Sequence, residues 1–65
     1  MITVIIEPDE NVLTFPRLNT VLQLLGKLGF KRNDALVIRE GELLTPDRKF
    51  RDGDTIRIRP VMSRG

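Results

Sequence analysis

Apolar residues recur with helical spacing in TVLQLLGKLG, residues 20–29. Four apolar positions at i, i+3, i+4 and i+7 define one buried helix face; they are Val21, Leu24, Leu25 and Leu28. Leu18 and Leu22 widen this apolar stripe. The sequence therefore predicts one amphipathic helix, which packs by this face.

Both ends of this helix carry residues suited to capping. Asn19 or Thr20 can accept hydrogen bonds from the amides of the first turn. Gly29 can take the left-handed conformation that commonly ends a helix. Gly26 lies inside the helix and costs about 1 kcal/mol relative to Ala, so the helix depends on packing to persist. A length of about two to three turns is expected.

The residues before the helix predict a β-hairpin. Residues 2–7, ITVIIE, are β-branched, and residues 8–11, PDEN, form a turn cluster. A second strand at residues 12–15 stops at Pro16. Because side chains alternate along a strand, the first strand should bury one face; that face consists of Ile2, Val4 and Ile6.

The residues after the helix predict two more strands. Residues 35–38, ALVI, are apolar on both faces, which is typical of a strand inside a sheet. Residues 43–44 begin a short segment that Pro46 ends, and residues 45–51 form a loop with Phe50 turned inward. The three aromatic residues are expected to pack in the core or at the helix ends; they are Phe15, Phe30 and Phe50.

The last predicted strand follows a strong turn signal, DGD, at residues 52–54. Residues 55–59, TIRIR, alternate cleanly, so the two isoleucines point inward and the two arginines, Arg57 and Arg59, point outward. Residues 61–65 have no turn or strand to enter and should extend into solvent. We therefore expect a domain at residues 1–60 and a flexible C-terminal tail at residues 61–65.

The order of these elements predicts an α+β fold. A hairpin, a crossover helix and further strands give a mixed sheet of four to five strands with one helix packed across one face. The right-handed crossover rule leaves few other arrangements. This is the β-grasp, or ubiquitin-like, architecture.

Composition excludes several classes of function. The chain has 65 residues, a net charge of +2, and no Cys, His, Trp or Tyr. This removes zinc fingers, iron–sulfur clusters, thiol nucleophiles and histidine bases. We expect no bound metal or cofactor and no enzyme activity of its own. With no signal peptide and no apolar run of membrane length, the expected location is the cytoplasm, with no membrane partner.

Several segments together resemble the sulfur-carrier branch of the ubiquitin-like proteins. They are the helix residues TV and LL at 20–21 and 24–25, the stretch ALVIREGELL at 35–44, the DGD turn at 52–54 and the run RPVMS at 59–63. Known members serve thiamine synthesis, molybdopterin synthesis, tRNA thiolation and protein modification. The resemblance covers nearly the whole chain.

The resemblance implies a function for the tail. The carboxylate of the terminal Gly65 would be adenylated by a separate enzyme that uses ATP, as for the thiamine and molybdopterin carriers. It would then become a thiocarboxylate that a sulfur-accepting synthase consumes. Partner-binding positions would be Val61, Met62, Ser63 and Arg64, together with the two arginines of the last strand. The family normally ends in Gly-Gly, and Arg64 replaces the first of these glycines.

Other readings of the arginines and of the function stay open. Arg57 and Arg59 can form a solvated strand face that limits edge pairing, or they can join Arg39 in a docking patch for an acidic partner. The chain can be a binding module for RNA or a regulatory protein, or a degenerate carrier kept as a scaffold. Nucleic acid is not the expected partner, because a net charge of +2 is modest.

Overall fold

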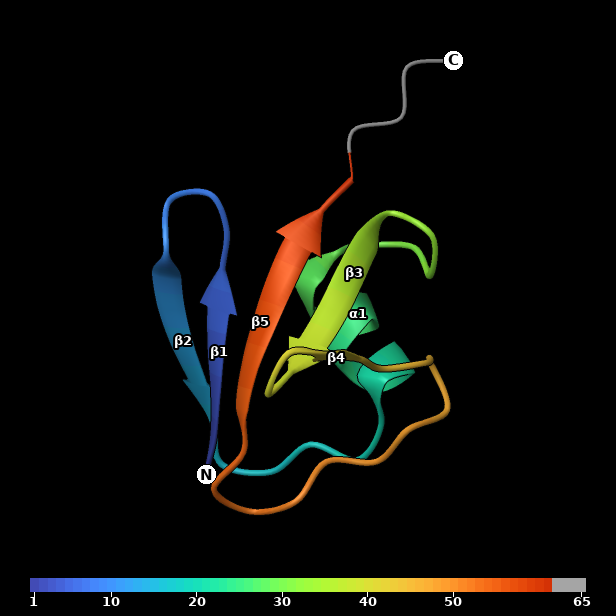
Figure 1. Ribbon diagram of the computed structural model, residues 1–65. Helices are drawn as coiled ribbons and strands as arrows, with labels where there is room; N and C mark the ends of the chain where they lie inside the picture. The colour runs from blue at the N-terminus through green and yellow to red at the C-terminus, as the bar shows by residue number, and fades with distance from the viewer. Residues whose placement is uncertain (62–65) are drawn as a thin grey trace.

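Strands and helix follow one another along the chain in the predicted order (Figure 1). The computed structural model describes residues 1–61. The elements are β1 (Ile2–Ile6), β2 (Asn11–Phe15), α1 (Val21–Leu28), β3 (Ala35–Arg39), β4 (Glu42–Leu43) and β5 (Thr55–Pro60). Each strand boundary lies within one residue of the prediction, because turn residues mark the strand ends.

The five strands form one mixed sheet in the order β2-β1-β5-β3-β4. The two strands at its centre, β1 and β5, are parallel, and the other neighbouring pairs are antiparallel. Figure 1 shows α1 behind the sheet, on the side of β5 and β3, with β2 at the free left edge. The chain is therefore an α+β protein with one helix on one face of a sheet.

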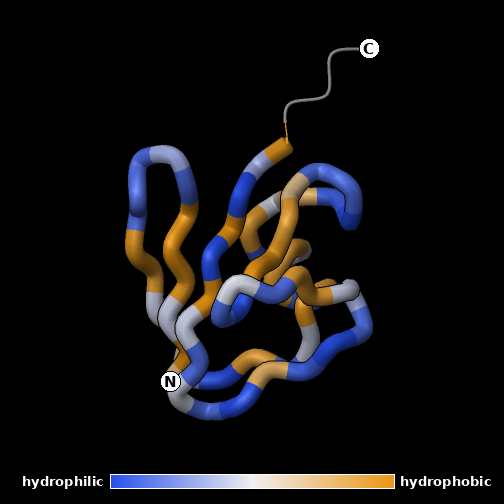
Figure 2. Tube along the Cα trace, viewed as in Figure 1, coloured by the Kyte–Doolittle hydropathy of each residue, from blue (hydrophilic) through white to orange (hydrophobic). Residues whose placement is uncertain are grey.

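The core lies between α1 and the sheet. Val21, Leu24 and Leu25 of the helix are buried, as predicted from their spacing. Buried strand residues oppose them, and these are Ile2, Val4, Ala35, Val37, Ile56 and Ile58. The aromatic residues pack partly buried against this cluster, as predicted; they are Phe15, Phe30 and Phe50. Figure 2 shows the complementary pattern, with hydrophilic segments at the β1–β2 turn and in the loop before β3.

The prediction that Leu22 extends the buried helix stripe is wrong. Its side chain is 48% exposed, whereas Leu18, which precedes the helix, is buried. Each helical residue turns the chain by about 100°, so Leu22 points about 110° away from the centre of the stripe. The buried face of α1 is narrower than the run of leucines indicates.

The prediction that residues 35–38 form a strand inside the sheet is confirmed, because β3 lies between β5 and β4, but only one face of this strand is covered. Ala35 and Val37 are buried on the side of α1, but Leu36 on the other side is 39% exposed. The sheet has a helix on one face only, so a strand inside the sheet still presents every second side chain to solvent.

The helix caps follow the sequence closely. Thr20, rather than Asn19, is the N-cap, and its hydroxyl accepts a hydrogen bond from the amide of Gln23 at 3.3 Å. Gly29 ends the helix with φ of 82°, and the Phe30 amide donates to the Leu25 carbonyl at 2.9 Å. Both orphan ends of a short helix are therefore satisfied locally.

The long loop before β5 closes the N-terminal end of α1. The amides of Val21 and Leu22 donate to the carbonyls of Arg48 and Pro46, each at 3.0 Å. The Phe50 amide donates to the Asn19 carbonyl at the same distance. The loop thus satisfies first-turn donors that have no partner within the helix, and it fixes Phe50 in its inward position.

Gly26 inside α1 and Gly29 at its C-terminal cap should respond oppositely to alanine. Gly26 lies inside the helix, and a Cβ added there would meet no atom within 4 Å. Gly26→Ala should therefore raise the free energy of unfolding by about 0.5–1 kcal/mol. Gly29→Ala should lower it by about 1–2 kcal/mol, because the left-handed conformation is strained with a Cβ. Urea denaturation measures both changes, and changes of the same sign would contradict this account of the cap.

Two leucines of α1 provide a matched test of the core. Leu24→Ala should lower the free energy of unfolding by about 2–5 kcal/mol, because the side chain is fully buried and its removal leaves a cavity. Leu22→Ala should cost less than about 1 kcal/mol, because that side chain is half exposed. Thermal unfolding followed by circular dichroism compares the two variants. Equal losses would mean that α1 is rotated relative to the sheet.

Candidate functional site at the end of the central strand

Arg57 and Arg59 lie on the sheet face opposite α1, which we term the outer face. They alternate along β5 with Ile56 and Ile58, which are fully buried against α1. The predicted inward and outward positions in this strand are thus confirmed. The interpretation that the arginines limit edge pairing is wrong, because β5 is the central strand and has a partner on each side.

The turn after β1 brings two acidic residues to these arginines. Arg57 donates from Nη1 to Glu7 Oε2 at 2.9 Å and to Glu10 Oε2 at 2.6 Å. Arg59 donates from Nε to Glu7 Oε1 at 2.8 Å. Glu7 therefore bridges both arginines, and its side chain is only 20% exposed. Two cations and two anions form a cluster with no net charge.

The ion pairs stabilise the charged form of every member whose pKa they shift. Hydrogen bonds from Arg59, and then from Arg57, hold the pKa of Glu7 below its ordinary value. Hydrogen bonds to Glu10 and Glu7 raise the pKa of Arg57, and the bond to Glu7 raises the pKa of Arg59. The positive charge of the outer face is consequently matched within the chain at neutral pH.

Arg39 does not belong to this cluster, so the expected patch of three arginines is not formed. In β3 it shares the face of Val37, on the side of α1, because side chains alternate. Its guanidinium donates to Asp54 Oδ2 at 3.0 Å, and its side chain is 15% exposed. Asp54 also accepts from the Arg51 amide at 2.8 Å, which anchors the predicted turn.

An apolar row crosses the outer face on either side of Arg57. Strand register places one residue of each strand in this outer-face row, in the order Val12, Ile5, Arg57, Ile38 and Leu43. The two end residues of the row are each 60% exposed. Sequence reasoning missed this surface, although the signal was present: strands that are apolar at successive residues have apolar side chains on both faces.

The chain leaves the sheet at the end of β5, beside the charged cluster. The Val61 amide donates to the Asp34 carbonyl at 2.8 Å, and Val61 is 45% exposed. A hollow of about 400 Å³ adjoins this exit, and it is lined by Glu7, Pro8, Arg59 and Pro60. The other predicted tail positions, Met62, Ser63, Arg64 and Gly65, lie outside the described residues.

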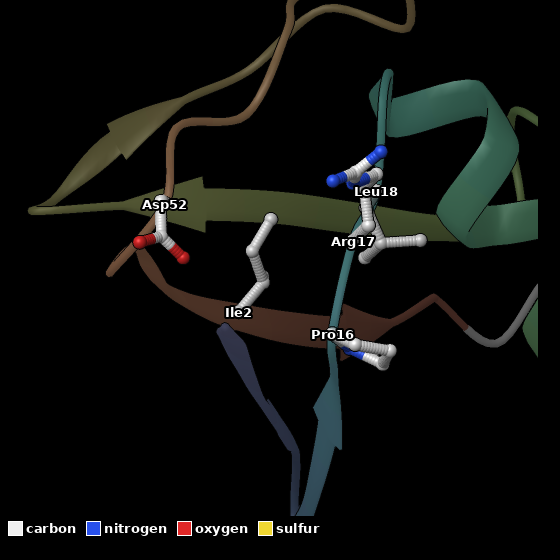
Figure 3. A pocket seen from close by; sticks show the side chains of 5 residues that line it. All are labelled: Ile2, Pro16, Arg17, Leu18 and Asp52. Carbon is white, nitrogen blue, oxygen red and sulfur yellow. The ribbon is translucent and has the colours of Figure 1, made fainter.

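A second hollow lies at the opposite end of the sheet. Its volume is about 290 Å³, and its lining residues are Ile2, Pro16, Arg17, Leu18 and Asp52 (Figure 3). Because β1 and β5 are parallel, this hollow adjoins their starting ends, whereas Val61 follows the far end of β5. It is therefore separate from the site where the chain leaves the sheet.

Comparison with protein-family models and with curated proteins gives no match for this chain. Among residues 1–61, no helix has the length and apolar character needed to span a membrane. The same residues contain no group of three or more His, Cys, Asp or Glu side chains arranged to hold a metal ion.

Glu7→Gln should reduce the pH dependence of stability. The pKa of Glu7 is lower in the folded chain than its ordinary value of 4.5, so the unfolded chain binds the proton first. The ionised Glu7 carboxylate stabilises the fold fully above pH 4.5, and this stabilisation disappears as pH falls through the pKa of Glu7 in the folded chain. The wild type should therefore lose stability below about pH 4.5, and the variant should lose less over this interval.

Chemical denaturation between pH 2 and pH 7 measures this difference. Glu40→Gln is the matched control, because Glu40 is exposed and forms no ion pair with the other residues that the structure describes. It should leave the acid slope unchanged. Identical slopes for the wild type and Glu7→Gln would show that the cluster contributes nothing to stability.

Proposed function

We propose that this chain is a β-grasp sulfur-carrier protein that acts through the carboxylate of Gly65. In this proposal it is a substrate of an adenylating enzyme rather than an enzyme itself. A thiocarboxylate on Gly65 would then supply sulfur to a biosynthetic synthase, for thiamine, molybdopterin or a related product. The proposal takes Gly65 as the carboxyl-terminal residue of the active carrier.

The arrangement of strands supports a β-grasp fold. A hairpin, β1 and β2, leads into α1, and the chain then returns to the sheet as β3, β4 and β5 in the order β2-β1-β5-β3-β4. The single observation that carries the functional proposal is that β5 is the central strand and runs parallel to β1. The chain therefore leaves the sheet at its middle, and Gly65 follows Val61 by four positions in the sequence.

The proposed chemistry needs no catalytic side chain in this protein. A carboxylate oxygen of Gly65 attacks the α-phosphorus of ATP, which forms an acyl-adenylate and releases pyrophosphate. Sulfide then attacks the acyl carbon and displaces AMP, leaving the thiocarboxylate. With a persulfide donor, an acyl disulfide forms first, and a thiol reduces it to the thiocarboxylate. Activation is required because a carboxylate is a poor electrophile.

The outer face is the surface that we propose for the adenylating enzyme. Its apolar row extends across the sheet beside β5, and the same strand leads into the tail. A partner that contacts this face would therefore bind at a fixed distance from Pro60, the last residue of β5, after which the tail begins. Since the charges of Arg57 and Arg59 are matched by Glu7 and Glu10, the complementary surface should be mainly apolar rather than strongly acidic.

Arg64 defines what the partner's channel must accommodate. In the resembling family two terminal glycines leave the backbone clear of side chains. Here a long cation precedes Gly65. We propose that the matching adenylating enzyme has a wider or acidic channel at this position.

The ion pairs of the outer face argue against the alternative of an RNA-binding module. Phosphate binding requires cations that are available to the ligand. Arg57 and Arg59 already donate to carboxylates, and Arg39 lies on the other side of the sheet with Asp54. An RNA ligand would have to displace these internal partners before it gained phosphate contacts.

Intact-mass spectrometry can test the carrier proposal. The chain is incubated with a sulfur-carrier adenylating enzyme from the same cells, ATP and sulfide. We expect a mass increase equal to the exchange of one oxygen for sulfur. Deletion of Gly65 should abolish it, whereas Arg57→Gln, which leaves the tail intact, should only slow it.

Arg64→Gly separates an active carrier from a degenerate one. Loading of both the wild type and Arg64→Gly supports the proposal. Loading of Arg64→Gly alone would mean that the wild-type chain has lost the reaction and is a scaffold. No loading of either chain by any such enzyme from these cells would reject the carrier function.

A further inference from the structure

We infer that the free edge of β2 is an interaction surface for β2 of a second copy, with the two strands antiparallel about a twofold axis at Leu13. This inference goes beyond the proposed carrier function and does not depend on the tail. It rests on the exposure of β2, on the direction of its backbone groups, and on the charges at its two ends.

β2 is an edge strand that lacks the usual protection against pairing. Four of its five residues are exposed, with Val12 at 60% and Leu13 at 41%. The sequence of the strand, NVLTF, contains no charged residue and no proline, and its register with β1 is continuous. Natural edge strands commonly carry charges, prolines or bulges that block pairing. Figure 1 shows no described element beyond this edge.

The hydrogen bonds of β1 establish which groups of β2 are free. The amides of Thr3 and Glu7 donate toward β5, to Asp54 and Ile58, at 3.0 and 2.9 Å. Because backbone groups alternate in direction along a strand, the other residues of β1 face β2. Their partners in β2 are Asn11, Leu13 and Phe15. The amide and carbonyl groups of Val12 and Thr14 consequently point away from the sheet.

These outward groups select one register for a symmetric pair. With the twofold axis at Leu13, Val12 of each copy lies opposite Thr14 of the other, and each such pair exchanges two hydrogen bonds. An axis at Val12 or at Thr14 would use only one outward residue of each strand in this way. The axis at Leu13 is therefore the register that satisfies all the outward groups of β2.

The side chains agree with this register. Leu13 lies opposite Val4, so it shares the face that carries α1, yet the helix leaves it 41% exposed. Because the twofold axis is perpendicular to the joined sheets, the two helices lie on the same side. The two Leu13 side chains then contact each other and cover the part of β2 that α1 does not reach.

Charge complementarity favours a second copy over an unrelated strand. Asp9 precedes β2 by two residues and Arg17 follows it by two, so an antiparallel pair brings the acidic start of each strand near the basic end of the other. Both residues are exposed, and neither forms an ion pair with another residue in the described range 1–61. The strand between them is neutral, so the charges at its two ends favour the antiparallel orientation of the two β2 strands.

The expected dimer is weak and leaves the carrier surface open. Two short strands bury less than the roughly 1,200 Å² of a stable protein interface. Association should therefore depend on concentration. The joined sheets would place Val12, the end of the outer-face row in each copy, beside Thr14 of the other copy, and β5 would remain at the centre of its own half.

Cysteine cross-linking tests the register in the full-length chain, which has no native cysteine. Directly opposed residues in a non-hydrogen-bonded antiparallel pair have Cα atoms about 4.5 Å apart, within the range that a disulfide spans. Leu13→Cys should form disulfide-linked dimers under mild oxidation. Leu43→Cys is the matched control, because Leu43 is also an exposed leucine on an edge strand, and it should cross-link far more slowly.

A charge exchange tests the choice of a second copy. In sedimentation velocity, Arg17→Asp should weaken dimerisation roughly three- to tenfold, since two attractive surface pairs become repulsive. The double variant Asp9→Arg with Arg17→Asp should restore it. Circular dichroism checks that each variant is folded. A monomeric wild type at all concentrations, equal cross-linking of the two cysteine variants, or no restoration by the double variant would overturn the inference.

Discussion

The parallel pairing of β1 and β5 sets the position of every other element in this sheet. Strands from the two ends of the chain meet at the centre of the sheet, and Val4, Ile56 and Ile58 on their helix side are fully buried. Parallel strands require a crossover, and α1 lies between the first hairpin and β3 within that connection. Because β5 is the middle strand, the chain also leaves the sheet from its middle, at the end where β5 finishes.

Burial on one side of β5 determines what lies on the other side. Since Ile56 and Ile58 must face α1, Arg57 and Arg59 must face away from it. The turn after β1 then supplies Glu7 and Glu10 as partners. By its composition this strand would offer free positive charge, but in the structure it presents a neutral cluster with apolar neighbours.

Much of the fold could be predicted because local signals agreed with it. The helix was indicated by its spacing and by Gly29, and the strand ends were indicated by Pro16 and by the turn at residues 52–54. The errors concern Leu22 and Arg39, and they share one cause. Each depends on whether another layer covers a given side of an element, and periodicity identifies the faces of an element without saying which of them is covered.

The sequence alone determined the type and order of the elements, because hydrophobic period, capping residues and turn residues act within a few positions of one another. Which side chains meet on the surfaces of the domain became known from the three-dimensional arrangement alone. The cluster of Glu7 with Arg57 joins residues fifty positions apart, and the outer-face row draws one residue from each strand of the sheet. Such contacts arise from strand order and register, which depend on packing across the whole domain.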